Sequence, residues 1–285
     1  MHNNDIISMK TIATQLNDRT FTDYFYRLML IARSVFKWNN LPNGIDEKWI
    51  ERYLFNEGKC LFYNDPMRGF MVAKCTDSGQ LNYYDEPTKL TPYGTNYQGT
   101  PLRNNEDCVL MRNNDIMLPT VHTIQLYALR LADITRTIDV NVNAQKTPIA
   151  VTCTDKQLKS VQKAYNQFTG NEPVIYADKN LDLNNINVLK TTAPVVFPEL
   201  ELQKKNIWNE CMTFLGVNNA NQDKRERLVA DEVSANDDQI AVSAQVMLKA
   251  RERACEQINE LFNLDISVEL RVKPQKEQKE VVLND

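Results

Sequence analysis

Histidine is almost absent from this chain, which has only His2 and His122 among 285 residues. Zinc sites and serine or cysteine nucleophile systems usually depend on histidine, so the sequence argues against those chemistries. The phosphate-binding pattern GxxxxGK[ST] and the dinucleotide-binding pattern GxGxxG are missing as well, which argues against nucleotide sites of these two types. We therefore predict a protein that is not an enzyme and that carries no cofactor or metal.

Long apolar runs are also missing. No stretch approaches the ~20 apolar residues that a membrane helix needs. The first ten residues lack the basic-then-apolar order of a signal peptide, so we expect assembly in a cytoplasm and no membrane partner. The cysteines form no CxxC pair, and most have apolar or helical neighbours, so buried free thiols are expected. They are Cys60, Cys75, Cys108, Cys153, Cys211 and Cys255.

An excess of positive charge is lacking too, because 33 basic and 37 acidic residues leave a net charge of -4. A protein that grips nucleic acid tightly is usually basic, since phosphate neutralisation supplies much of the affinity. This charge balance argues against a protein that binds nucleic acid tightly. It is compatible with a surface past which DNA slides.

The longest helical pattern starts at Pro119 and Thr120 and runs for about 25 residues to Asn143. At ~1.5 Å per residue it would form a rod of roughly 35–40 Å. Further apolar residues lie off its main stripe, so we expect the rod to pack against several neighbours. The stripe is Val121, Ile124, Ala128, Leu131, Ile138 and Val142, and the additional residues are Leu126, Tyr127, Leu129 and Ile134.

Two shorter helices are expected before this rod. Thr20 and Asp23 could cap a helix that continues to Val35, and a second helix fits residues 46–55, with Gly58 as its stop. The region that follows is predicted to be rich in strands. Its expected features are a hairpin of 71–75 and 81–84 around a turn at 76–80, an irregular excursion over 86–106, and strands at 108–111 and 115–118 around a turn at 113–114.

A small α/β unit is predicted over 148–196, after Pro148 ends the rod. A second amphipathic helix then ends at Gly216, where glycine suits a left-handed helix end. Asn236 and Gln239 form a plausible capping box for the last strong helix, which is expected from Asp237 to Phe262. The residues between these two helices would form a long, charged loop, and loops of this length are usually functional or disordered.

Six segments of the sequence match those of one known family in the same order. They are WNNLP (38–42), NAQKTP (143–148), GNEPVI (170–175), IWNECMTFLGVNNAN (207–221), DEVSANDDQI (231–240) and CEQINELF (255–262). With these segments the chain resembles the head–tail connector, also called the portal or upper collar protein, of small, short-tailed bacteriophages with protein-primed DNA replication. The likeness covers about residues 20–270 and is loosest over 60–106.

The resemblance implies an α+β, predominantly α-helical portal fold with long channel-wall helices, a small α/β clip unit and a β-rich (SH3-like) wing. We assign the chain to this fold in eight segments. They are N-terminal helices (1–58), the wing (59–118), the first channel-wall helix (119–147), the clip (148–196), the second channel-wall helix (197–216), a tunnel loop (217–236), a wing or crown helix (237–263), and a C-terminal strand with a mobile tail (264–285).

The resemblance also implies a ring of twelve subunits through which double-stranded DNA passes. In such a ring one lysine per chain becomes a closed belt of positive charge around the DNA. The predicted channel residues are Lys190, Lys224, Arg225 and Arg227. The predicted tunnel-loop residues are Asn219, Asp223, Asp231, Glu232 and Asn236. A further family lysine falls at Glu199 or Pro198, so that belt is absent or reversed in sign.

The partners that the family implies are the major capsid and scaffolding proteins, a packaging ATPase and the lower collar and tail proteins, with the ring located in the virion at one capsid vertex. A packaging RNA is not carried over, because residues 1–9 contain no lysine or arginine. Two alternatives remain from the residues themselves. One is another phage structural component, such as a lower collar or scaffold-type protein. The other is a metal-dependent nuclease using Asp231, Glu232, Asp237 and Asp238.

Overall fold

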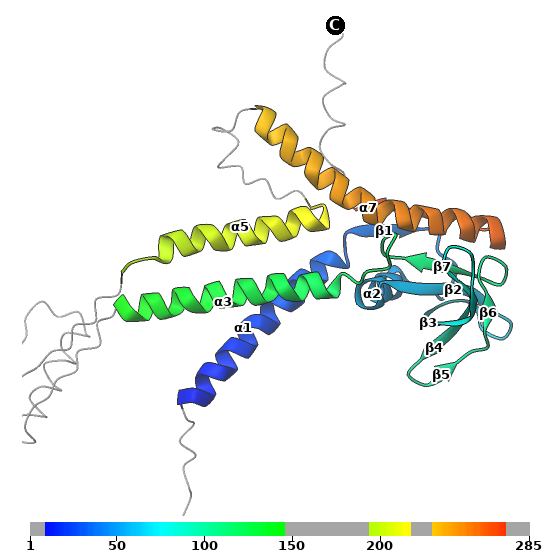
Figure 1. The fold of residues 1–285 in the computed structure, drawn as a ribbon, viewed down its shortest axis with the longest axis horizontal. Helices are drawn as coiled ribbons and strands as arrows, with labels where there is room; N and C mark the ends of the chain where they lie inside the picture. Colours follow the sequence, from blue (N-terminus) through cyan, green and yellow to red (C-terminus); the bar gives the residue numbers. More distant parts are fainter. Residues whose placement is uncertain (1–8, 146–193, 218–229, 272–285) are drawn as a thin grey trace, which may run out of the picture. The chain divides into compact units, whose positions relative to one another are not determined.

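The computed structural model describes residues 9–145, 194–217 and 230–271 (Figure 1). It separates into two compact units, one made of Met1–Asp133 with Lys204–Asp285 and the other of Ile134–Gln203. The elements, in chain order, are α1 (Met9–Ala32), β1 (Phe36–Asn39), α2 (Glu47–Glu57), β2 (Lys59–Asp65), β3 (Gly69–Leu81), β4 (Pro87–Gly94), β5 (Tyr97–Gln98), β6 (Leu102–Arg103), β7 (Cys108–Arg112), α3 (Val121–Gln145), α5 (Phe197–Leu215), α7 (Ala230–Phe262) and β8 (Ser267–Leu270).

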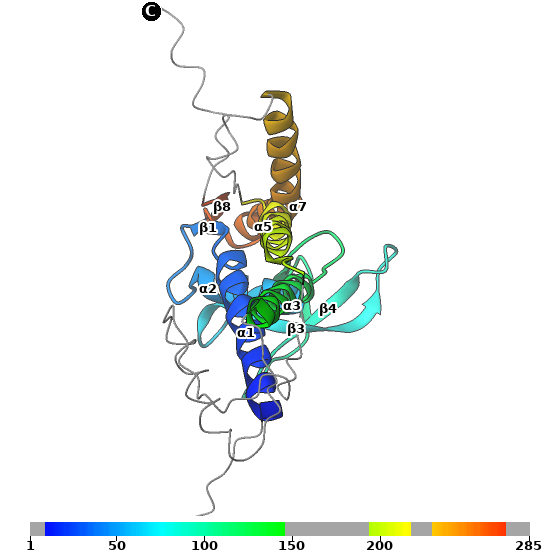
Figure 2. The ribbon, with the colours of Figure 1, turned by 90° about the vertical axis from the view of Figure 1, so that its left-hand side faces the viewer.

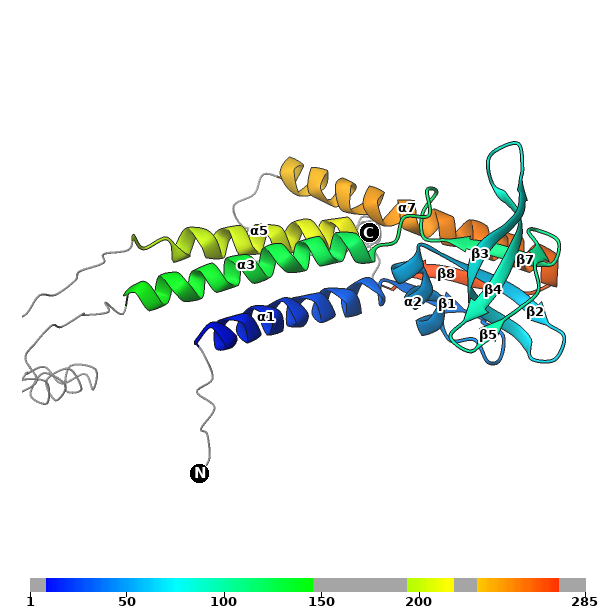
Figure 3. The same ribbon diagram turned by 60° about the horizontal axis from the view of Figure 1, so that its bottom comes forward.

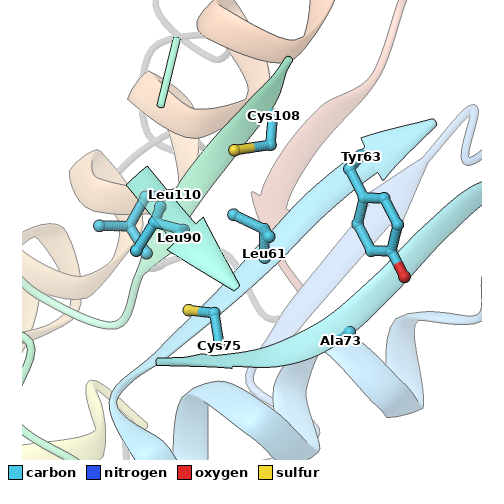
Figure 4. Close-up of a cluster of buried hydrophobic side chains, with 7 residues drawn as sticks. All are labelled: Leu61, Tyr63, Ala73, Cys75, Leu90, Cys108 and Leu110. Atoms are coloured by element: carbon cyan, nitrogen blue, oxygen red, sulfur yellow. The ribbon is translucent and has the colours of Figure 1, made fainter. Parts of the chain in front are cut away.

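The predicted β-rich region forms an antiparallel sheet in the first unit, with strand order β5-β4-β3-β2-β7 and with β6 paired to β4. One face of this sheet has a small core in which cysteine and tyrosine side chains pack with aliphatic ones (Figure 4). Its members are Leu61, Tyr63, Ala73, Cys75, Leu90, Cys108 and Leu110. The sulfur atoms of this core therefore serve packing, as the scattered cysteine spacing predicted.

The predicted hairpin turn at 76–80 is wrong, because these residues continue β3, and β3 and β4 form a long paired ribbon (Figure 2). Gly79 has φ +77 at an irregularity in the β3–β4 register, which is how a strand accommodates an extra residue. The actual turn lies at 82–86. There the Asn82 side chain accepts hydrogen bonds from the main-chain N–H groups of Tyr84 (2.8 Å) and Glu86 (3.0 Å). Asparagine turns of this kind are common.

The irregular excursion predicted over 86–106 is also wrong, since it contains β4, β5 and β6. Pro87 and Pro92 argued against a strand in this stretch, because proline has no N–H group to donate to a neighbouring strand. However, β5 and β6 each pair with only two residues of β4, and a partly covered edge strand tolerates proline. The strand predicted at 108–111 is confirmed as β7, whereas 115–118 forms no strand.

The first helix begins earlier than predicted. Thr20 lies inside α1, where its hydroxyl donates to the Leu16 carbonyl oxygen at 2.7 Å, so it does not cap the helix. The helix also ends before Val35, and the residues that follow form β1. This strand pairs antiparallel with β8, which confirms the C-terminal strand predicted within 264–285. Across that pairing, residues more than 200 positions apart in the sequence lie side by side.

The second helix matches its prediction closely. The Asp46 side chain accepts a hydrogen bond from the Lys48 N–H at 2.9 Å and so caps the start of α2. Gly58 ends the helix in the left-handed region, with φ +74. A Cβ atom at this position would lie 2.0 Å from the Met117 carbonyl oxygen. Glycine is therefore required here by conformation and by space.

A buried ion pair fastens α7 to α2. The Arg251 guanidinium donates to the two carboxylate oxygens of Glu51 at 2.9 and 2.8 Å, and both side chains are at least 97% buried. The same guanidinium donates to the main-chain and side-chain oxygens of Asn113, at 3.2 and 3.1 Å, and stacks 4.0 Å from the Phe36 ring centroid. The Trp38 indole N–H completes the network by donating to Glu51 at 2.9 Å. One arginine thus ties together α7, α2, β1 and the end of β7.

The second unit contains the end of α3 and the start of α5. Asn141 joins them, since its side-chain N–H donates to the Pro194 carbonyl oxygen (2.8 Å) and its side-chain oxygen accepts from the Val196 N–H (3.3 Å). The α/β clip predicted over 148–196 lies almost wholly outside the described residues.

Candidate ring-forming and channel surfaces

Most of the predicted channel residues lie outside the part of the chain that the structure describes. They are Lys190, Asn219, Asp223, Lys224, Arg225 and Arg227. Asp231, Glu232 and Asn236 are helical, because α7 already begins at Ala230. The predicted start of this helix at Asp237 is therefore wrong by about two turns. Residues 230–262 include no proline or glycine, and two acids close to a helix start suit its dipole.

Both long helices predicted from the sequence are present, as α3 and α5, and they run side by side (Figure 3). In the first unit their facing surfaces are fully apolar at the centre. Ile124 and Leu131 of α3 are 0% exposed, as is Cys211 of α5. An ion pair closes one border of this contact, with Arg130 Nη1 3.1 Å from Glu210 Oε2.

A different side of α3 is apolar but exposed. Leu126 and Leu129 are 57% and 54% exposed, and at 100° per residue they lie opposite the buried Ile124, Ala128 and Leu131. Two neighbouring exposed leucines on one side of a helix form a small apolar surface that the subunit's described residues leave uncovered. The sequence indicated this apolar side, because Leu126 and Leu129 lie off the main apolar stripe of the predicted helix. Leu131, in contrast, is buried inside the subunit, so replacing it would test folding of the subunit rather than contacts between subunits.

A groove lies between α3, α5 and α7 within the first unit. It has a volume of about 660 Å³ and is lined by Tyr127 of α3, Asn206, Asn209, Glu210, Thr213 and Phe214 of α5, and Ser243 of α7. The Tyr127 and Phe214 ring centroids are 6.5 Å apart. Burial raises the pKa of Tyr127, with smaller contributions from Cys211 and Glu210, so its hydroxyl stays protonated and can donate a hydrogen bond.

Among the described residues no group of three or more His, Cys, Asp or Glu side chains could hold a metal ion. None of the described helices has the length and apolarity needed to cross a membrane.

The comparison with known families identifies the family of this chain. The family described as Phage Connector (GP10) matches residues 4–275. The chain belongs to the phage connector family. This family supplies the portal of the virion and consists of structural proteins.

Three solved structures are among those found in a comparison of structures. A chain from the portal and tail of native bacteriophage P68 is 16% identical, with a TM-score of 0.54, covering 96% of this chain and 94% of that one. An HK97 family phage portal protein from Corynebacterium diphtheriae is 10% identical (TM-score 0.37, 90% and 93% covered). A chain from the virion of a native gene transfer agent particle is 9% identical (TM-score 0.45, 93% and 84% covered). The likeness to the P68 chain is one of fold.

Proposed function

We propose that this connector assembles as a ring of twelve subunits at one capsid vertex and serves as the conduit for DNA packaging, retention and ejection. The observation that carries the proposal is the exposed apolar face of α3. Leu126 and Leu129 have no cover within the chain's described residues, although they lie on a helix whose opposite side is fully buried. A neighbouring copy of the same helix bundle would bury them.

In this ring α3 and α5 would line or back the channel. Lys190, Lys224 and Arg225 would form sparse positive belts on a wall that is otherwise acidic. Sparse belts suit a conduit, because many phosphate contacts would hold the DNA in place through counterion release. The packaging ATPase and the lower collar and tail proteins would bind the ring from outside the capsid, while the capsid and scaffolding proteins would surround its wide end.

The apolar face can be tested with Leu126→Arg/Leu129→Arg. Burial of one leucine side chain contributes about 1.5–3 kcal/mol, so two charged replacements at every interface should abolish the ring. Native mass spectrometry should find about twelve copies for the wild type and monomers or small oligomers for the variant. Negative-stain images of the wild type should show a central opening.

The matched control is Met67→Arg, which changes a side chain that is 92% exposed in the turn between β2 and β3. This variant should still form rings, and all three proteins should have the same far-UV circular dichroism. If the double-leucine variant forms rings as the wild type does, the role of this α3 face is refuted. Wild-type assemblies without a central opening would favour the lower collar or scaffold-type alternative.

A further inference from the structure

A basic surface on α2 and the end of α1 has more cations than its own subunit neutralises. We call it the basic face; it consists of Arg33, Lys48, Trp49 and Arg52. Trp49 is 42% exposed, with Lys48 Nζ 5.4 Å and Arg52 Cζ 5.8 Å from its ring centroid. Among the described residues Asp46 is paired with Lys48 at 2.8 Å. No carboxylate there forms an ion pair with either arginine of this face.

Arg33 is held in place although it lacks such a partner. Its Nη2 donates to the Lys48 carbonyl oxygen at 3.1 Å, and its Nε is buried without a hydrogen-bond partner in the described structure. Burial lowers the pKa of Arg33, and the nearby Arg52 guanidinium lowers it further. The nearby Glu51 acts in the opposite direction, but both of its oxygens already bind Arg251. The basic face is thus a fixed site of excess positive charge.

The opposite excess lies on α7. Glu252, Glu256 and Glu260 are exposed and spaced four residues apart, so they form one row along the helix, here called the acidic face. Within the described part of the chain none of them is in an ion pair. Arg253, between the first two, binds Asp115 at 2.8 Å instead. Like charges at this spacing destabilise a helix, so the subunit alone gains nothing from the row.

Most residues of the two faces lie away from the side on which α2 and α7 meet. Arg251 of α7 and Glu51 of α2 are in direct contact, so each helix turns that side toward the other. At 100° per residue, Glu252, Glu256 and Glu260 lie roughly 100–180° around α7 from Arg251. By the same measure Lys48, Arg52 and Trp49 lie roughly 60°, 100° and 160° around α2 from Glu51. Two separate and complementary surfaces on one subunit are what a head-to-tail ring contact requires.

We propose that the basic face of each subunit docks onto the acidic face of the next copy of this chain. The inference rests on the proposed ring and adds a contact that sets the direction in which its subunits follow one another. A second copy is the occupant that the charges favour, because one chain has both halves of the contact in equal number. Tryptophan and arginine are also the side chains that most often dominate the energy of protein interfaces. Trp49 would be covered at the centre of the contact.

Two charge-reversal variants test this contact. The first, Lys48→Glu/Arg52→Glu, makes the basic face acidic and leaves the half-buried Arg33 in place. The second, Glu252→Lys/Glu256→Lys/Glu260→Lys, makes the acidic face basic. All five side chains are exposed, so both proteins should fold, which far-UV circular dichroism would verify. Lys89→Glu, a reversal on an exposed position of β4, is the control.

Each variant alone should repel its own copies, and its ring fraction in native mass spectrometry should fall at least tenfold below the wild type and the control. An equimolar mixture should recover rings to within twofold of the wild type, because every interface then joins opposite charges. These rings should contain the two variants in equal number and in alternation. Such rescue cannot arise from misfolding of either variant.

Other outcomes separate the two proposals. If the wild type forms rings and each variant alone does so equally well, the charged contact is refuted while the ring stands. Folded variants that lose rings alone but stay dissociated when mixed would also refute it. If the wild type itself forms no ring under any assembly condition, the proposed function fails, and this inference fails with it.

Discussion

Removal of Glu51 should be among the most damaging single changes in the described part of this protein. In Glu51→Leu the Arg251 guanidinium would keep its place, with a side chain only 2% exposed, but would lose both carboxylate hydrogen bonds. Removing one partner of a buried pair costs about 3–5 kcal/mol, because the other charge is left without compensation. The two Asn113 oxygens and the Phe36 ring are neutral and cannot replace the lost charge.

The double variant Glu51→Leu/Arg251→Met should recover part of this loss. It removes the buried charge and fills the site with apolar side chains, a replacement that is often neutral or stabilising for a buried pair. Recovery should be incomplete here, since the Trp38 indole N–H and the Asn113 side-chain oxygen would lose their partners. An unpaired buried polar group costs about 1–3 kcal/mol. The double variant should therefore be about 1–3 kcal/mol more stable than Glu51→Leu.

Urea denaturation at a concentration where the chain is monomeric would measure these differences by tryptophan fluorescence and circular dichroism. Arg253→Met is the matched control, two residues along the same helix. Its ion pair with Asp115 is exposed, with side chains 62% and 66% accessible, so its loss should cost less than about 1 kcal/mol. A double variant no more stable than Glu51→Leu would refute the reasoning, because the cost would then not come from an uncompensated charge.

Two further predictions concern packing. Burial raises the pKa of Cys75 and of Cys108 from the usual thiol value of 9.0 to about 12, which leaves roughly a thousandfold less thiolate at neutral pH. In a Cys153→Ser background the native protein should therefore react with a thiol reagent far more slowly than the urea-unfolded protein, and equal rates would contradict the burial. Gly58→Ala should cost at least about 3 kcal/mol from its backbone conformation and its clash with a main-chain oxygen. Gly44→Ala, with φ +93 but no atom within 4 Å of the new Cβ, should cost about 1–2 kcal/mol, and equal melting temperatures for the two variants would argue against the clash.

The elements that the sequence predicted well are those specified by neighbouring residues. Asp46 and Gly58 mark both ends of α2, and the apolar spacing of α3 and α5 placed these helices within a few residues of their true bounds. The prediction was wrong where pairing with another strand outweighed the local turn composition. Gly79 and its neighbours have the composition of a turn, yet the ladder with β4 keeps them in β3.

Contacts between distant residues could not be predicted from one sequence. Glu51 and Arg251 are 200 positions apart, and nothing in either local pattern indicates that both are buried. The pairing of β1 with β8 could not be predicted either, because each strand is short and, among the described residues, its only strand partner is the other one. For the candidate surface, the sequence identified the additional apolar side of α3. Only the structure separates Leu131, which stabilises the subunit, from Leu126 and Leu129, which are exposed.

The two proposed contacts would contribute differently to the same ring. Burial of Leu126 and Leu129 is favourable wherever apolar surface meets apolar surface, and it has little directional preference. Apolar helix faces alone would therefore allow slipped or reversed pairings of subunits. The charged faces on α2 and α7 supply what is missing, since juxtaposed like charges reject a wrong partner orientation and opposite charges fix the register. A closed ring needs every interface to repeat the same rotation. The leucine face would therefore determine how strongly the subunits associate. The charged faces would determine whether every interface repeats the same rotation, so that the subunits close into a ring.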